Sequence, residues 1–418
     1  MQSGFHGLSG PDMEAQPVRL HMRQIRKALR RADLSDTFTV GKYAFSPYMA
    51  CEHGCAYCDG RAERYYVEGE FDGDIVVRRN LPDQLAQELP RLREPGFVTI
   101  GSGISDAYQP VEAEERITRR CLEVLVRHRF PVTLMTKSAL VRRDEDLITA
   151  INARSRCLII MSLVHADDQT RAAFEPRTST VQDRLQALRA FKAAGCATGV
   201  LAMPLLPGIT DDESSIQQLY RMVAACNVDF VQPGGLTLRP GRQKAFYMDR
   251  LRAVRPDLLA LYERLYQEER ASGAPRADYG AGLMARCREH QRRCGIPCLV
   301  PHSVYHGQLM VYDEVAVLLR HMVDLYQELT PDTARLRRAT RRYMTWITDR
   351  KRAYNRHRSW DYRALSAELT DAGKLDDIVD NRKLASFLRR ILQDDVVLDY
   401  ITLTLKPAAA GTDDPQEV

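Results

Sequence analysis

The sequence predicts an α/β fold of about six βα units, followed by a mainly helical region. Three observations support this prediction. Short apolar runs of strand length alternate with segments of helical periodicity over residues 37–240. This alternation is typical of a parallel sheet whose strands are covered by helices on their outer faces. The strand-like runs then stop near residue 240. A partial (βα)6 barrel and an open doubly wound sheet both fit this pattern.

The predicted elements follow in order along the chain. A first strand near "TFTVGKYAF" leads into a cysteine-containing loop, "SPYMACEHGCAYC". The later predicted strands are "GFVTIGSG", "PVTLMTKS", "CLIIMSLV", "ATGVLAMPLLPG" and "DFVQPGGLTL". The helical segments between them are "NLPDQLAQELPRL", "VEAEERITRRCLEVLVRHR", "RRDEDLITAINAR", "TVQDRLQALRAFKAAG" and "DDESSIQQLYRMVAACN". In either fold, a functional site belongs in the loops at the carboxyl ends of the strands.

The organisation outside this unit is simpler. We expect residues 1–36 to form an N-terminal tail and basic segment, and residues 241–406 to be mainly helical. Residues 407–418, which include "PAAAGTDDPQEV", should be a mobile tail. The chain of 418 residues is 44% hydrophobic and 28% charged, as in ordinary globular proteins. Its net charge of +5 permits an anionic partner without requiring one.

The start of the chain does not resemble a secretory signal, and no apolar run is long enough to span a membrane. We therefore expect a cytoplasmic protein without membrane contact, whose cysteines stay reduced.

Three cysteines, Cys51, Cys55 and Cys58, lie within eight residues of one another. An odd number makes a structural disulfide a poor explanation, and clustered thiols in a reducing compartment more often bind metal. A structural zinc ion would need a fourth ligand, which His53 can supply. An iron–sulfur cube held by three cysteines would instead keep one iron open for a small molecule. The spacing alone leaves both alternatives.

The C-x3-C-x2-C motif, with Tyr57 before its last cysteine, resembles the radical S-adenosylmethionine (SAM) superfamily. The ordered segments "SPYMACEHGCAYC", "IVVRRN", "GSGISDAYQPVE", "TLMTKSALVRRD", "IIMSLV" and "GVLAMPLLPGITDDE" are most similar to its spore photoproduct lyase-like, or DNA repair photolyase-like, branch. The resemblance covers about residues 38–240. It implies a partial (βα)6 barrel of the radical SAM type with a C-terminal helical extension.

The resemblance also implies two cofactors and a reaction. Cys51, Cys55 and Cys58 would bind three irons of a [4Fe–4S] cluster, and SAM would chelate the fourth. Reduction by an electron donor such as a flavodoxin or ferredoxin would cleave SAM to methionine and a 5′-deoxyadenosyl radical, which abstracts hydrogen from the substrate. The protein would supply binding, orientation and exclusion of side reactions.

Five further residues are candidate SAM contacts by the same resemblance. Lys137, after the third strand, would pair with the SAM carboxylate, although a solvated lysine also fits. Ser105 and Asp106 lie on the loop after the second strand, which otherwise is an ordinary tight turn. Ser162, which ends the fourth strand, would contact the ribose or carboxylate, unless it is only a polar strand end. Tyr57 would stack near the adenine or simply shield the cluster.

The sequence departs from spore photoproduct lyase at one position that matters. The lyase carries a hydrogen-donating cysteine on the loop after the second strand, whereas the matching loop here, "GSGISDAYQP", has none. Repair of a thymine dimer by that route is therefore not expected. Cys121, Cys157, Cys196 and Cys226 lie in apolar settings and are predicted to be core residues.

Two other groups are candidates for binding. Cys287, Cys294 and Cys298, with His290 between them and His302 and His306 beyond, either hold an auxiliary metal or are thiols on a packed helix face. Residues 335–358, from Arg335 to Arg358, hold ten Lys or Arg and one Asp, interleaved with Tyr343, Trp346 and Tyr354. This stretch suits nucleic-acid phosphates and bases, but a solvated helix packed through its aromatic residues has the same pattern.

The leading hypothesis is thus a radical SAM enzyme of unknown substrate, with nucleic acid as one candidate. The alternative is a non-catalytic, zinc-binding, nucleic-acid-binding protein.

Overall fold

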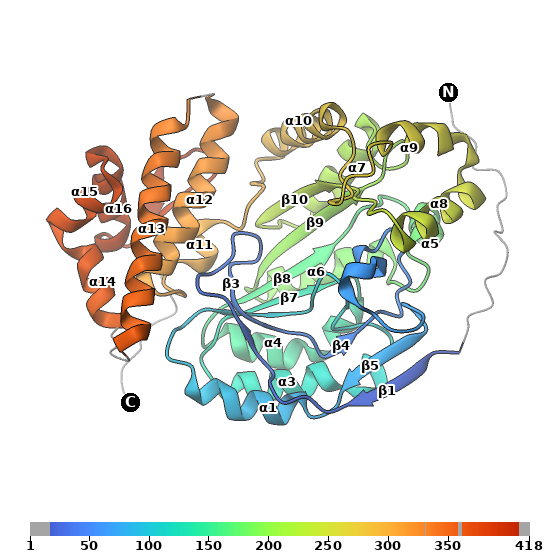
Figure 1. Cartoon of the computed structure of the whole chain (residues 1–418), viewed down its shortest axis with the longest axis horizontal. Coiled ribbons are helices and arrows are strands. Elements are labelled where there is room, and N and C mark those ends of the chain that lie inside the picture. Colours follow the sequence, from blue (N-terminus) through green and yellow to red (C-terminus); the bar gives the residue numbers. More distant parts are fainter. Residues whose placement is uncertain (1–16, 331, 358–361, 409–418) are drawn as a thin grey trace.

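The central sheet follows the predicted order of strands (Figure 1). The computed structural model describes residues 17–330, 332–357 and 362–408. Its seven-stranded sheet has the order β10-β9-β8-β7-β6-β3-β2. The strands are β2 (Arg30–Arg31), β3 (Gly41–Phe45), β6 (Phe97–Ile100), β7 (Val132–Thr136), β8 (Cys157–Ser162), β9 (Ala197–Leu205) and β10 (Phe230–Gly235).

Neighbouring strands from β3 to β10 are parallel, and only β2 at the edge is antiparallel. Strand order never reverses along the sheet, whereas a doubly wound sheet must reverse it. The partial (βα)6 barrel with a helical C-terminal region is therefore confirmed.

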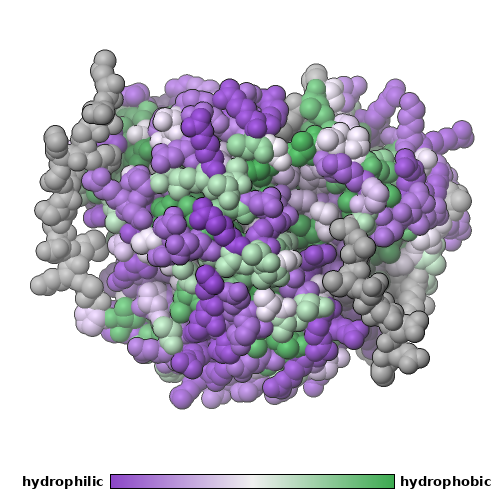
Figure 2. All heavy atoms as spheres, turned by 180° about the vertical axis from the view of Figure 1, so that it is seen from behind, coloured by the Kyte–Doolittle hydropathy of each residue, from purple (hydrophilic) through white to green (hydrophobic). Residues whose placement is uncertain are grey.

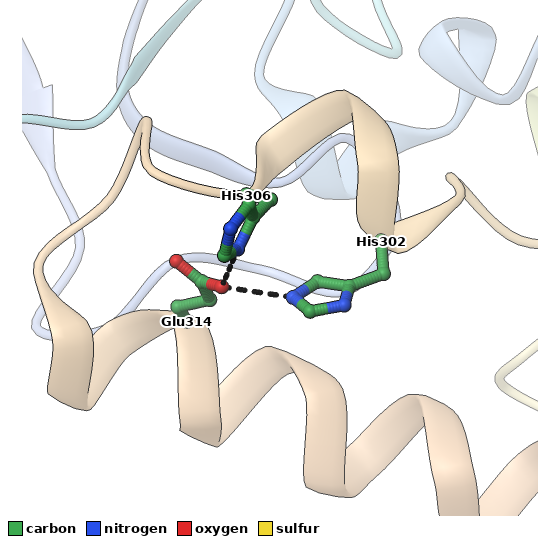
Figure 3. Close-up of side chains that lie close together, drawn as sticks. All are labelled: His302, His306 and Glu314. Carbon is green, nitrogen blue, oxygen red and sulfur yellow. Dashed lines mark hydrogen bonds and ion pairs between the residues drawn. The ribbon is translucent and has the colours of Figure 1, made fainter. Parts of the chain in front are cut away.

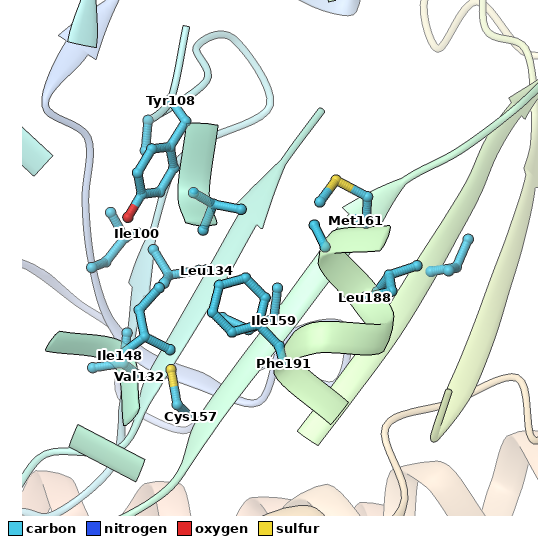
Figure 4. Close-up of a cluster of buried hydrophobic side chains, with 14 of the residues drawn as sticks. Ile100, Tyr108, Val132, Leu134, Ile148, Cys157, Ile159, Met161, Leu188 and Phe191 are labelled. Carbon is cyan, nitrogen blue, oxygen red and sulfur yellow. The ribbon is translucent and has the colours of Figure 1, made fainter. Parts of the chain in front are cut away.

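Helices with an apolar stripe cover the outer face of the sheet. They are α1 (Leu81–Glu88), α3 (Ile117–Val126), α4 (Glu145–Asn152), α6 (Val181–Ala193), α7 (Glu213–Ala224) and α10 (Ala277–Cys294). The short helices α2 (Glu112–Glu115) and α5 (Asp168–Phe174) belong to the segments that follow β6 and β8. Figure 4 shows Leu134 and Ile159 of the sheet with Ile148 of α4 and Phe191 of α6, all fully buried. Burial of each such side chain contributes about 1.5–3 kcal/mol. Cys157 lies in this same core, as predicted.

A second, small sheet lies beside the barrel. β1 (Arg19–Arg23) pairs in parallel with β5 (Asp74–Arg78), which also pairs with β4 (Tyr48–Met49). Sequence analysis placed β1 in an N-terminal tail and basic segment and did not anticipate this strand. The Arg19 guanidinium donates two hydrogen bonds to Asp74, at 2.7 and 2.6 Å, and lowers the pKa of that carboxyl group. The first 16 residues and residues 409–418 lie outside the described part of the chain.

The C-terminal helices form a second layer with its own core. After α8 (Arg242–Val254) and α9 (Leu259–Leu265) come α11 (His302–Tyr305), α12 (Val311–Leu329), α13 (Ala334–His357), α14 (Tyr362–Thr370), α15 (Ala372–Val379) and α16 (Arg382–Gln393). A short hairpin, β11 (Val396–Leu398) and β12 (Leu405–Pro407), follows. Tyr343 of α13 packs with Leu319 and Leu388 in this core and is fully buried.

This helical layer closes the amino ends of the barrel strands. Val304 and Tyr305 pack against Phe97, Leu158 and Phe230, which lie at or near the starts of their strands. In Figure 1 the orange helices α11–α13 stand at this end of the sheet. The carboxyl ends are left for the loops that carry the candidate site residues.

Hydrophilic residues cover most of the face shown in Figure 2, with small apolar patches between them. Among the described residues, none of the helices has the length and apolar character needed to cross a membrane.

Candidate functional site

The carboxyl edge of the sheet brings together the residues predicted to form the site. The cysteine loop follows β3, Ser105 and Asp106 follow β6, Lys137 follows β7, and Ser162 ends β8. Because these strands are parallel neighbours, their carboxyl ends meet at one edge.

The cysteine loop is held by backbone hydrogen bonds to distant segments. The Cys51 N–H donates to the Phe71 carbonyl at 3.1 Å, and the Ala56 N–H donates to the Phe174 carbonyl at 2.8 Å. Gly54 has φ +65°, and a Cβ atom there would approach the Asp72 carboxylate to 3.0 Å. A side chain at position 54 would therefore strain the loop.

The three thiols are mostly buried. Cys51 and Cys55 expose only 8% and 6% of their surface, and Cys58 is half-buried. Burial raises the pKa of all three thiols, so their metal-free side chains are neutral. A bound cation offsets this cost, because thiolates are the form that binds metal.

The spacing of the ligand atoms argues against a single zinc ion at this loop. Four thiolate ligands of one zinc ion lie about 3.8 Å apart, given a Zn–S bond of about 2.3 Å. Within the described residues, the one set of three His, Cys, Asp or Glu ligand atoms within 4.8 Å of one another lies elsewhere, at His302, His306 and Glu314. Among the described residues, Cys51, Cys55, Cys58 and His53 do not form such a set. Three separated buried thiolates suit a multinuclear cluster, in which each iron takes its own cysteine.

Asp106 joins the loops that follow β6 and β7. Its carboxylate accepts hydrogen bonds from the Tyr108 N–H at 2.8 Å, the Thr136 hydroxyl at 2.7 Å and the Lys137 N–H at 2.8 Å. One carboxylate oxygen also lies 3.5 Å from His53 Nδ1. Both oxygens are thus engaged within the protein, so Asp106 positions Lys137 and His53.

Glu175 is a site residue that sequence analysis missed. Its side chain is fully buried and lies 2.5 Å from the Arg184 guanidinium, and it accepts a hydrogen bond from the Tyr57 hydroxyl. Burial would raise the pKa of Glu175, but the charges of Arg184 and then Lys137 hold it well below its usual range. Lys137 Nζ lies 3.9 Å from Glu175 and 5.6 Å from the centre of the Tyr57 ring.

The two serines differ in their surroundings. Ser105 is buried, and its hydroxyl accepts a weak hydrogen bond from the Gln109 amide at 3.4 Å. Ser162 is half-buried; its carbonyl accepts a hydrogen bond from Arg184 at 2.9 Å, and no bond to its hydroxyl is found among the described residues.

Two buried histidines complete this polar cluster. His53 is 2% exposed, and burial lowers its pKa. His165, three residues after β8, is 1% exposed, and neither ring nitrogen has a hydrogen-bond partner within the described structure. Burial lowers the pKa of His165 to about 4, so it is neutral at pH 7.

The cysteine loop also bridges the open seam of the barrel, since β3 and β10 are not paired. Asp59 lies 2.6 Å from Arg239, which follows β10. At the start of α8, the Arg242 N–H donates to Glu63 at 2.7 Å, and the Gln243 amide donates to the Tyr57 carbonyl at 3.1 Å. The loop is therefore fixed from both sides of the seam.

The other cysteines are not assembled in this way. Cys121, Cys157, Cys196 and Cys226 are buried in the barrel core, as predicted. Cys287 of α10 is fully buried there too, and Cys294 packs against it. Cys287, Cys294 and Cys298 do not form a set of three close ligand atoms in the described part of the chain.

The close group in Figure 3 is a hydrogen-bonded network. The Leu398 N–H donates to His302 Nδ1 at 3.0 Å, so Nε2 carries the proton and donates to Glu314 at 2.8 Å. His306 faces Glu314 with Nδ1 at 2.7 Å and Asp395 with Nε2 at 3.2 Å, and this bond to Glu314 raises its pKa. A histidine that binds a metal through one ring nitrogen donates a hydrogen bond from the other. In His302 the other nitrogen, Nδ1, instead accepts one from the Leu398 N–H. The protonation required by these bonds leaves no nitrogen lone pair for a metal ion.

A cavity of about 650 Å³ lies beside the basic face of α13. Its lining is Arg338, Arg341, Arg342, Thr345, Trp346, Arg350, Glu368, Lys374, Asp377 and Ile378. Arg350 is paired with Glu368 at 2.6 Å, but no partner for Arg338, Arg341 or Lys374 is found among the described residues. Arg358 lies outside the described residues, as does the side chain of Tyr354.

Comparison with known proteins places the chain in a family. The model of the radical SAM superfamily matches residues 45–219, which contain all three cysteines and the loops after β6, β7 and β8. An uncharacterized protein of Mycobacterium tuberculosis strain H37Rv is 30% identical over 234 residues, which are 54% of this chain and 67% of the relative. An uncharacterized protein of Methanocaldococcus jannaschii is 26% identical over 209 residues, 50% of this chain and 75% of the relative.

Similar solved structures include spore photoproduct lyase complexed with dinucleoside spore photoproduct, at 17% identity and a TM-score of 0.49. That match covers 66% of this chain and 79% of the lyase chain. Streptococcus suis SuiB bound to the precursor peptide SuiA has 14% identity and a TM-score of 0.35. It covers 54% of this chain and 46% of SuiB.

Radical SAM proteins use a [4Fe–4S] cluster and SAM. The donor set at the carboxyl edge fits such a cluster, since it offers three thiols, two buried and one half-buried, on the same edge as Lys137. The chain belongs to the radical SAM superfamily, and these two groups are its cofactors.

Proposed function

We propose that this protein is an enzyme that cleaves SAM reductively and uses the resulting radical to take hydrogen from a substrate. Cys51, Cys55 and Cys58 would hold the [4Fe–4S] cluster, and SAM would bind beside it. When bound, these cofactors supply a 5′-deoxyadenosyl radical that abstracts hydrogen. The observation that carries the proposal is that the three cysteines, two of them buried and one half-buried, lie at the same edge of the sheet as Lys137.

The protein's own residues bind and orient SAM. Lys137 pairs with its carboxylate, since Glu175 at 3.9 Å is already neutralised by Arg184 at 2.5 Å. Ser105, on the loop after β6, and Ser162, at the end of β8, offer hydroxyl groups from either side of β7. Tyr57 is tethered through its hydroxyl to Glu175, so its ring is fixed beside Lys137. Asp106 acts through the Lys137 backbone.

The chemistry differs from thymine-dimer repair by spore photoproduct lyase. The loop after β6 contains no cysteine that can return a hydrogen atom to a product radical. A substrate radical here must be quenched by another group. A flavodoxin or ferredoxin is the proposed electron donor.

Nucleic acid is the partner that the α13 cavity fits best. Arg338, Arg341 and Lys374, for which the described part of the chain offers no partner, can neutralise phosphates. The half-buried Trp346 offers a ring on which a base can stack. This cavity belongs to the helical layer at the amino ends of the strands, away from the cysteine loop. A nucleic acid bound there is held at a distance from the reacting centre.

Anaerobic reconstitution with iron, sulfide, SAM and dithionite tests the activity. The wild-type protein should form 5′-deoxyadenosine and methionine, whereas Cys55→Ala should form neither above background. Deoxyadenosine formation that is equal in both proteins would refute the proposal. The alternative, a zinc-stabilised binding protein, predicts a colourless protein that does not respond to SAM.

A second experiment tests the cavity. The chain has two tryptophans, so Trp360→Phe leaves Trp346 as the only indole. Single-stranded DNA or RNA should quench its fluorescence, with a binding constant that falls steeply with salt. Lys374→Glu together with Arg338→Glu should weaken binding and flatten the salt slope. Quenching by an acidic peptide but not by oligonucleotides would assign the cavity to a protein partner.

A further inference from the structure

His165 is the buried polar group at the carboxyl edge that the proposed function leaves unused. It lies on the loop after β8, three residues beyond Ser162. Its neighbour Phe174 lies in one buried cluster with Tyr57 and Cys55. The His165 ring stacks on Phe174, with 6.3 Å between centroids and 15° between planes. Phe174 in turn holds the cysteine loop through its carbonyl.

The ring is fixed, yet its hydrogen-bonding capacity is unfilled. Neither Nδ1 nor Nε2 has a partner within the described structure, although the side chain is only 1% exposed. Burying an unpaired donor or acceptor is unfavourable, and buried polar groups in native proteins are nearly always bonded. An orphaned imidazole beside a cofactor site is therefore expected where the cofactor itself supplies the partner.

The charge state of the ring indicates which part of SAM it suits. A neutral imidazole offers one N–H donor and one nitrogen acceptor. The methionine end of SAM carries an ammonium and a carboxylate, and Lys137 provides a charge for the latter. The nucleoside end carries only neutral hydrogen-bonding groups, on the ribose and the adenine edge. A neutral ring with one donor and one acceptor matches the nucleoside end.

We infer that His165 is a SAM-binding residue that hydrogen-bonds the nucleoside of SAM. This inference rests on the proposed function and deepens it, because it adds a contact from the loop after β8 that the sequence motif does not contain. Phe174 contacts both groups: its ring stacks on His165, and its carbonyl accepts a hydrogen bond from the Ala56 N–H of the cysteine loop. The same residue therefore positions the nucleoside contact and the cysteine loop.

The test compares His165→Leu with wild-type protein after anaerobic reconstitution. Iron content and thermal unfolding are measured first, and then SAM affinity is measured by equilibrium dialysis without reductant. His165→Leu should load iron fully and unfold at the same temperature as wild type or higher, because it removes an unpaired polar group. Its SAM affinity should fall about tenfold, as expected for loss of a hydrogen bond to a buried partner.

Three comparisons make the result specific. His165→Gln, which keeps a donor and an acceptor, should recover most of the SAM affinity. Binding of 5′-deoxyadenosine should weaken in His165→Leu, whereas binding of methionine should not. His321→Leu is the matched control: His321 is equally buried but fully bonded, so this variant should unfold at a lower temperature with unchanged SAM affinity.

The outcomes separate the inference from the proposed function. Unchanged SAM affinity in His165→Leu overturns the inference. So does loss of iron or a lowered unfolding temperature in that variant, because either would show a structural role. If the wild-type protein loads iron but binds no SAM, the proposed function itself fails.

Discussion

The two ends of the barrel sheet differ in whether their buried polar side chains find bonding partners within the protein. At the amino end, Lys42 is fully buried and lies 2.7 Å from Asp313 and 3.0 Å from Glu94, so its charge is matched within the fold. At the carboxyl end, three buried thiols have raised pKa values and His165 has no partner in the described structure. At the first end the buried charge of Lys42 is paired within the fold, whereas the second end is where we propose that the cofactors bind.

Two histidines make the contrast at the level of single side chains. Burial lowers the pKa of both His165 and His321 to about 4. His321 donates from Nε2 to the Thr37 carbonyl at 2.9 Å and accepts at Nδ1 from the Tyr400 hydroxyl at 2.8 Å. His165 has neither bond. This difference in bonding at equal burial is the basis on which we propose a binding role for His165 and a structural role for His321.

The largest expected difference between the two ends is in iron binding. Cys58→Ala should lose the cluster and reduce SAM cleavage to background, because one iron loses its only protein ligand. Cys157→Ala, a core thiol on β8, should keep full iron content and most of the activity. Iron analysis of both anaerobic proteins gives the comparison. Equal iron in the two variants would contradict the assignment of Cys58.

At the amino end, the largest expected effect is on stability. Asp313→Ala leaves the buried Lys42 with the Asp33 carbonyl and with Glu94, which Lys351 also contacts. It should lower the free energy of unfolding by about 3–5 kcal/mol. Urea denaturation measures this change. Asp249→Ala removes an exposed pair with Arg252 and should change stability by less than about 1 kcal/mol. If Asp313→Ala changed the free energy of unfolding by less than about 1 kcal/mol, the charge of Lys42 would not depend on its pairing with Asp313.

The buried histidines predict how stability depends on pH. Burial lowers the pKa of His53, His165, His302 and His321. The unfolded chain binds protons near pH 6.5, whereas the folded His321 remains neutral down to about pH 4. Stability should therefore fall as the pH decreases from 6.5 towards 4, by about 3 kcal/mol for His321 alone, at about 1.4 kcal/mol per pKa unit.

Urea midpoints at pH 7, 5.5 and 4.5 measure that dependence. The slope should be smaller in His321→Leu than in wild type, although the variant is less stable at pH 7 because it loses two hydrogen bonds. A stability that stays constant or rises on acidification over this range would contradict the neutral state of these rings.

The smallest expected effect concerns divalent metal. The hydrogen bonds at His302, His306 and Glu314 occupy every ring nitrogen, so added zinc or EDTA should not change the unfolding temperature of the apoprotein. A rise in that temperature with zinc, abolished by Glu314→Gln, would show a metal site at the amino end. It would also remove the contrast between the two ends.

The main features of the carboxyl end could be predicted from sequence because they are local. The motif from Cys51 to Cys58, the strand that ends before Lys137 and the strand that ends at Ser162 each lie within one short segment. Glu175 could not be predicted in this way. It bonds Tyr57, which is 118 residues earlier in the chain, and no periodicity marks such a pair. His165 could not be predicted for a related reason: what distinguishes it is that its ring nitrogens have no hydrogen-bond partner in the described structure, and a sequence does not show this.

In the helical layer, too, local features could be predicted from sequence and long-range packing could not. Its helices and the buried face of Tyr343 follow from periodicity. Outside that layer, the short strands β1 and β2 could not be predicted, because exposed basic residues such as Arg19 and Arg30 are equally common in a solvated segment. The cavity beside Trp346 likewise depends on how α13 and α15 pack.

The central claim is that the carboxyl end is completed by an iron–sulfur cluster with one iron open to SAM. The most direct test is electron paramagnetic resonance of the anaerobically reconstituted, dithionite-reduced protein. The account predicts about four irons per chain and a cluster signal that changes when SAM is added. A protein that binds no iron under strict exclusion of oxygen, or a cluster signal that SAM leaves unaltered, would contradict it.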